Sequence, residues 1–186
     1  MGIVALFFEE RIERAIIKGR LKKVVFWLSL AKWLKLQFGC LFLSQCIVRC
    51  CAFKPSEKKI EVVKLLLANG ADANARVRTW LCATPLESAI SAYDMAVVEV
   101  LAKNGADMYS ALMFVVECEG VWRQKGNFAK SDQDALDLPP TVEVLESLLA
   151  YAPGISDAQL DELVVLALEN SLPGVAPFLR SRANVC

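Results

Sequence analysis

VVKLLLANGAD, at residues 62–72, returns 35 residues later as VVEVLAKNGAD, at residues 97–107. In each copy the apolar residues recur with the period of a helix, and the run stops at a glycine, Gly70 or Gly105. Glycine adopts the left-handed conformation that closes a helix without a steric penalty. We therefore expect each copy to form a short amphipathic helix, and the chain to be built from internal repeats.

The segment between the two copies begins a further helix. Thr84, Pro85 and Glu87 stand where an N-cap, a first helical residue and the third residue of a capping box belong. We expect this helix to run to about Ala92 and a second helix to begin at Ala96. The repeating unit is thus a loop, a helix, a turn, a helix and a glycine stop.

This unit resembles the ankyrin repeat, which opens on Thr-Pro-Leu-His-x-Ala and closes on Val-Val-x-Leu-Leu-Leu-x-x-Gly-Ala-Asp. The match covers residues 84–107, with Glu87 in place of the family's histidine. The resemblance implies stacked helix pairs that bind partners through loop fingers and the concave surface of the first helices. In the family that histidine bonds to the neighbouring repeat, and the capping box of Glu87 replaces only its local role.

Weaker copies extend this pattern in both directions. Residues Ala15–Val24 fit the family's Ala-x-x-x-Gly-x-Leu-x-x-Val stretch, and Leu43–Ile47 parallels Leu86–Ile90. We predict an all-α, ankyrin-like helical solenoid that forms a single domain over 1–186. It has about five helix–turn–helix repeats, some of them degenerate, as expected at the ends of such a stack. The approximate repeats are 5–34, 38–72, 84–107, 110–153 and 156–186, with one long insertion loop at 119–140.

The composition excludes the commonest forms of catalysis. The chain contains no histidine, which removes Ser-His-Asp and Cys-His mechanisms and the most frequent general base. It also lacks the glycine-rich motifs that hold phosphates. Asp132, Asp134 and Asp137 fall in the predicted insertion, where a run of charge is usually solvated. We expect a non-catalytic protein with no cofactor.

The seven cysteines indicate a reduced, intracellular protein, since their number is odd and no secretory signal or CxxC pair accompanies them. Cys46, Cys50 and Cys51 share one predicted helix with Cys40 nearby. A single helix cannot wrap a tetrahedral zinc ion, so we expect no metal site and interpret these side chains as small core residues. We predict a cytoplasmic location.

The chain carries no predicted transmembrane segment. Its longest uncharged run in the most apolar region, 36–48, has 13 residues, whereas a span takes about 20. Charge is divided unevenly: residues 1–60 hold 12 Lys and Arg against 4 Asp and Glu, and residues 61–186 hold 9 against 17.

The predicted partner is another protein, bound through the long finger at 73–83. Arg76, Arg78, Thr79 and Trp80 lie on this finger, and tryptophan beside arginine is typical of binding hot spots. The alternative is that Trp80 folds back onto the neighbouring repeat. The resemblance does not name the partner; the chain looks like short ankyrin chains of intracellular bacteria and large viruses, where the family often engages a host protein.

Two further pairs are candidate partner-binding residues. Tyr93 and Asp94, at the predicted turn between two helices, either lie beside the finger or merely close the turn. Trp122 and Arg123 lie in the predicted insertion, and an insertion of that length is uncommon unless it is functional or disordered.

A competing interpretation concerns the basic region 14–36, which contains lysines, arginines, Trp27 and Trp33. Such a region can lie on an anionic membrane surface or bind an acidic partner. However, Gly19 divides it where the repeat has its turn, so packing in a repeat is favoured over membrane binding. Nucleic acid is not an expected partner, because the basic residues form no known reader motif.

Overall fold

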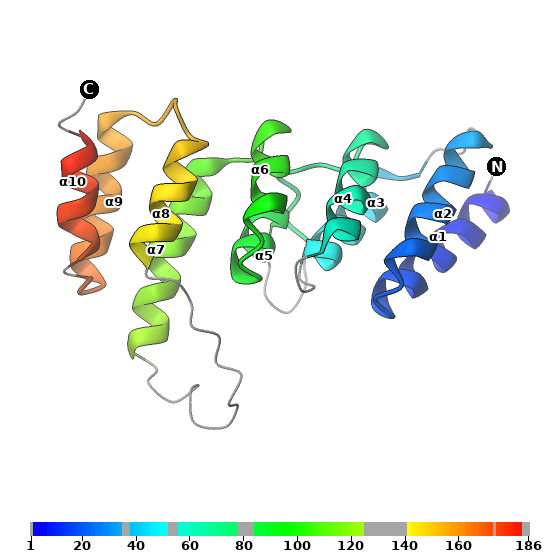
Figure 1. Cartoon of the computed structure of the whole chain (residues 1–186), viewed down its shortest axis with the longest axis horizontal. Helices are drawn as coiled ribbons and strands as arrows, with labels where there is room; N and C mark the ends of the chain where they lie inside the picture. Colours follow the sequence, from blue (N-terminus) through cyan, green and yellow to red (C-terminus); the bar gives the residue numbers. More distant parts are fainter. Residues whose placement is uncertain are drawn as a thin grey trace. The chain divides into compact units, whose positions relative to one another are not determined.

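The computed structural model describes residues 2–34, 38–51, 56–77, 84–124, 141–172 and 174–183 (Figure 1). Within these ranges the chain forms ten α-helices and no strand, which confirms the predicted all-α class. The helices are α1 Gly2–Ile17, α2 Leu21–Trp33, α3 Cys40–Cys51, α4 Glu57–Ala68, α5 Pro85–Ser91, α6 Met95–Lys103, α7 Met108–Gln124, α8 Thr141–Ala150, α9 Asp157–Glu169 and α10 Val175–Ala183.

The helices fall into two compact units, Met1–Ala106 and Asp107–Cys186. In the first unit α1 packs on α2, α3 on α4 and α5 on α6, so that consecutive helices form pairs. The first helices α1, α3 and α5 contact one another in succession, and so do the second helices α2, α4 and α6. This unit is therefore two layers of helices, one layer from each position in the pair (Figure 1).

The second unit is built by the same rule from four helices. The pairs are α7 with α8 and α9 with α10, and contacts join α7 to α9 and α8 to α10. Its core includes Leu112, Leu145, Leu148 and Leu163, whose side chains are fully buried.

The repeated phrase supplies the core of the first unit. In the first copy Val62, Val63 and Leu66 are fully buried on α4, and Val97, Val98 and Leu101 hold the corresponding places on α6. Their spacing puts all three on one helical face, which removes their apolar surface from water.

The helix starts follow the capping residues in the sequence. Thr84 accepts a hydrogen bond from the Glu87 backbone while the Glu87 side chain accepts from the Thr84 backbone, which confirms the predicted capping box. Ser156 and Gln159 form a second such box at the start of α9. These bonds satisfy backbone donors that a helix leaves unpaired.

In the part of the chain that the structure describes, five helix ends close with one backbone arrangement, in which a residue of positive φ follows the helix. At α6 the amide of Gly105 donates to the Ala102 carbonyl and the amide of Ala106 to the Leu101 carbonyl, both at 3.1 Å. This pair of bonds is the Schellman motif. The residues in the left-handed position are Gly19, Gly70, Tyr93, Gly105 and Ser171.

We predict that Gly105→Ala destabilises the protein by about 1–2 kcal/mol, because an L residue with a Cβ is strained at positive φ. A Cβ at Gly105 would meet no atom within 4 Å, so the cost comes from the backbone alone. Gly105→Asn is the matched control and is expected to cost less, since asparagine tolerates this conformation. Urea unfolding followed by circular dichroism measures both, and equal losses would contradict this explanation.

Candidate functional site

The described part of the predicted finger is anchored to two helix pairs. The Asp72 carboxylate accepts a hydrogen bond from the Asn74 amide at 2.8 Å, and the Asn74 side chain donates to the Gly105 carbonyl at 2.8 Å. The first bond shapes a turn after α4, and the second joins this turn to the end of α6. The base of the finger is thus held by the second-helix ends of two successive pairs.

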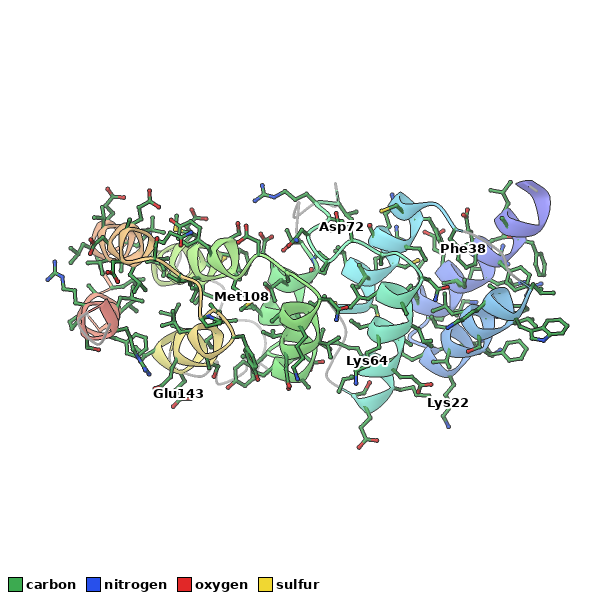
Figure 2. All side chains as sticks on the ribbon, turned by 90° about the horizontal axis from the view of Figure 1, so that it is seen from above. Lys22, Phe38, Lys64, Asp72, Met108 and Glu143 are labelled. Carbon is green, nitrogen blue, oxygen red and sulfur yellow. The ribbon has the colours of Figure 1, made fainter. Side chains whose placement is uncertain are left out.

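Only one of the four predicted finger residues lies within the described ranges. Arg76 is exposed just beyond the anchored turn, while its neighbour Val77 is buried. Arg78, Thr79 and Trp80 fall outside the described residues. Figure 2 shows Asp72, at the base of the finger, on the opposite side of the first unit from Lys64 and Lys22.

Tyr93 and Asp94 belong to the other end of the helix pairs. The finger follows the last residue of α4, whereas Asp94 caps α6 at its first turn and lies against Lys59, near the start of α4. The length of α4, 12 residues, separates these ends by about 18 Å. The two residues therefore close the turn between α5 and α6 rather than extending the finger surface.

Asp94 is also buried, so we leave it out of the proposed binding surface. Its Oδ1 accepts a hydrogen bond from the Val97 amide at 3.2 Å, and its Oδ2 lies 2.9 Å from Nζ of Lys59. The second contact is an ion pair between two buried side chains. Tyr93 in contrast is exposed and occupies the left-handed position of the turn.

Lys59 is the residue that the sequence interpretation missed. Its side chain is fully buried, and Nζ donates to the Cys51 carbonyl at 3.0 Å in addition to contacting Asp94. One ammonium group thus contacts the last residue of α3 and the cap of α6 from its place on α4. The sequence does indicate a buried position for Lys59, because helical spacing places it on the same apolar stripe as Val62, Val63 and Leu66.

Trp122 and Arg123 are placed differently from the prediction. Helix α7 continues to Gln124, so both residues lie on a helix, and the predicted start of the insertion at 119 is wrong. A glycine inside a helix costs only about 1 kcal/mol relative to alanine, so Gly120 does not end α7. The predicted insertion from 125 onward lies outside the described residues.

Three cysteines of α3, Cys46, Cys50 and Cys51, are core residues, whereas Cys40 is exposed, so its interpretation as a core residue is wrong. Burial raises the pKa of the Cys46 thiol to about 12, with a smaller contribution from Glu13. Burial also raises the pKa of Cys50 to about 12 and that of Cys51 far above its ordinary value, with Lys59 partly opposing both shifts. Among the described residues, no three Cys, Asp or Glu side chains gather as a metal site would require.

The N-terminal helix pair, α1 with α2, carries most of the exposed large apolar side chains of the described residues. Six of the nine large hydrophobic residues exposed within the described ranges lie between residues 6 and 34. Trp27 is half-buried, packed edge-to-face at 5.4 Å from Phe8, but Trp33 is 77% exposed. The basic region 14–36 therefore supplies both core and an exposed surface. No described helix is long and apolar enough to span a bilayer.

We predict that Asp94→Asn and Lys59→Met each destabilise the first unit by about 3–5 kcal/mol, because each leaves one buried charge without its partner. Asparagine keeps a hydrogen-bond acceptor at the N-cap, so the stability lost in Asp94→Asn reports the removal of the negative charge. The double variant is expected to lose less than the sum of the single losses. A double-mutant cycle from denaturant unfolding measures this coupling, and additive losses would show that the pair contributes no net interaction.

We also predict that iodoacetamide at neutral pH alkylates Cys40 in the native protein and leaves Cys46, Cys50 and Cys51 unmodified. The first is exposed, whereas the other three are buried and their raised pKa values keep them protonated. Peptide mass spectrometry locates the label, and unfolding in urea should expose all four. Rapid native labelling of Cys50 would show that α3 is not packed as described.

A scan of the chain against protein-family models finds no match, and a search of curated proteins finds none either.

Proposed function

We propose that the chain is a non-catalytic protein-binding module made of ankyrin-like helix pairs, working in a reducing intracellular compartment. The observation that carries this proposal is the anchored finger. Asn74 ties the base of the finger to the end of α6, so a partner meets a surface that is already ordered at its root. Pre-ordering lowers the entropic cost of binding.

Packing between the helix pairs supports the resemblance to the ankyrin family. First helices pack on first helices and second helices on second helices in both units. The pairs around Thr84 and Gly105 have the capping box and the glycine stop that the resemblance implies. The buried Lys59–Asp94 ion pair links two successive helix pairs. In the ankyrin family a histidine makes such a link, and this chain has Glu87 at that position.

The proposed binding surface consists of Arg76 and the finger residues Arg78, Thr79 and Trp80. An arginine and a tryptophan on one finger combine a fork of hydrogen-bond donors with a large apolar surface, the two features most frequent in binding hot spots. A partner with an acidic, partly apolar surface fits this chemistry.

We expect the double variant Arg76→Ala/Trp80→Ala to capture about tenfold less, or lower still, of at least one protein, because hot-spot side chains have been removed. Tagged wild type, this variant and the control Lys64→Ala are used to capture proteins from extract of the source cells, with quantitative mass spectrometry as the readout. Lys64 is exposed on α4, away from the finger base (Figure 2).

Circular dichroism establishes that all three proteins are folded. Loss of the same protein from the Lys64→Ala sample would point to a different surface. Equal recovery of every captured protein by all three would contradict the assignment of binding to the finger.

A further inference from the structure

Two helices carry exposed faces that are opposite in charge and alike in apolar character. Leaving Tyr93 aside, the exposed large hydrophobic residues of the described chain belong to the N-terminal pair, including Leu34 just after α2, or to α9. An exposed apolar patch bordered by charge is typical of an interaction surface. We propose that the exposed face of α2 binds the exposed face of α9 in a second copy of this chain.

The α2 face combines exposed apolar side chains with cationic ones. Val24, Leu28 and Ala31 are buried on one side of α2, and helical spacing places Phe26 and Trp33 on the other side. Phe26 is 58% and Trp33 77% exposed. The helix also carries Lys22, Lys23 and Lys32, all exposed, and contains no acidic residue. Figure 2 shows Lys22 pointing away from the helices of the first unit.

The α9 face has the opposite charge. Leu160, Leu163, Val164 and Ala167 are buried on one side of α9, whereas Val165 is 54% and Leu168 52% exposed. The helix contains no basic residue, and its acidic side chains are all exposed. These are Asp157, Asp161, Glu162 and Glu169.

Both helices have charge near their start and again near their end. Each helix has 13 residues. In α2 two lysines precede Phe26, and Lys32 and Trp33 end the helix; in α9 the first three acidic residues precede Val165 and Leu168, and Glu169 ends the helix. If the helices lie parallel, Lys22 and Lys23 meet Asp157 and Asp161, and Lys32 meets Glu169. Phe26, Val165 and Leu168 then lie between the ion pairs, and Trp33 lies beyond Lys32 at the end of α2. Burying these apolar side chains supplies affinity, while the opposite charges set the orientation and speed the encounter.

The predicted contact is weak and sensitive to salt. A single helix face covers less than the roughly 800 Å² per partner of a standard stable interface, and exposed charges are screened by salt. Because α2 of one copy meets α9 of another, each added copy leaves one α2 face and one α9 face available. Such a contact closes a dimer or a ring where the geometry allows it and otherwise forms growing chains of copies.

The first test uses variants that each disable one face. Phe26→Ser/Trp33→Ser removes the apolar part of the α2 face, and Val165→Ser/Leu168→Ser removes that of the α9 face. Sedimentation velocity should show wild type growing with concentration at low salt. Each variant alone should associate at least about tenfold more weakly, as expected when hot-spot side chains are removed. An equimolar mixture should form a one-to-one complex that grows no further, because it contains one intact α2 face and one intact α9 face.

Charge reversal is the second test and guards against variants that fail through misfolding. Lys22→Glu/Lys23→Glu should abolish self-association, and adding Asp157→Lys/Asp161→Lys to the same chain should restore it. Arg76→Ala/Trp80→Ala should leave it unchanged, because the finger takes no part in this contact. Protein capture by the finger and self-association through α2 and α9 are therefore tested independently, and either can be contradicted without the other.

Three outcomes would overturn the proposal. One is a wild type that stays monomeric at every concentration at low salt. Another is a mixture of the two serine variants that associates no more than either alone. The third is binding of monomeric wild type to vesicles of anionic phospholipid, lost in Lys22→Glu/Lys23→Glu and absent from neutral vesicles, which would assign the α2 face to a membrane surface.

Discussion

The first unit depends on one buried ammonium group. Lys59 stands on α4, donates to the end of α3 and contacts the carboxylate that caps α6, so three helices meet at a single charge. A buried ion pair is weak evidence for stability, because desolvation opposes the attraction of the two charges. We expect the pair to favour the observed register of α4 against α6, because a register that separates Nζ from Asp94 leaves two buried charges without partners.

Short-range chemistry made much of the fold predictable. Thr84 and Ser156 begin helices by bonding a backbone amide three residues ahead, and Gly70 and Gly105 end helices by adopting positive φ. Such features depend on neighbours along the chain, which a sequence displays directly. The end of α7 was missed because a glycine inside a helix carries only a small penalty, and the residues around Gly120 decide the outcome.

The candidate site was less predictable because it depends on contacts between distant residues. The sequence leaves open whether Asp94 lies beside the finger or closes a turn, because it does not state which end of a helix pair Asp94 joins. Its partner Lys59 lies 35 residues away. Trp27 and Trp33 share one basic helix, yet the first packs among aromatic rings and the second faces solvent. Helical period separates them only once the buried side of α2 is known.

The five left-handed residues have a consequence for how this chain can change over generations. Glycine, tyrosine and serine occupy the same backbone conformation at Gly19, Tyr93 and Ser171, between the two helices of a pair, and the bonds that hold them there come from main-chain atoms. A side chain in place of glycine at these turns costs about 1–2 kcal/mol, but the main-chain bonds that form the turn remain available to any residue except proline. The amino acid at these turns can therefore change while the backbone architecture stays the same. Sequence identity alone would then underestimate the structural similarity between one helix pair and the next.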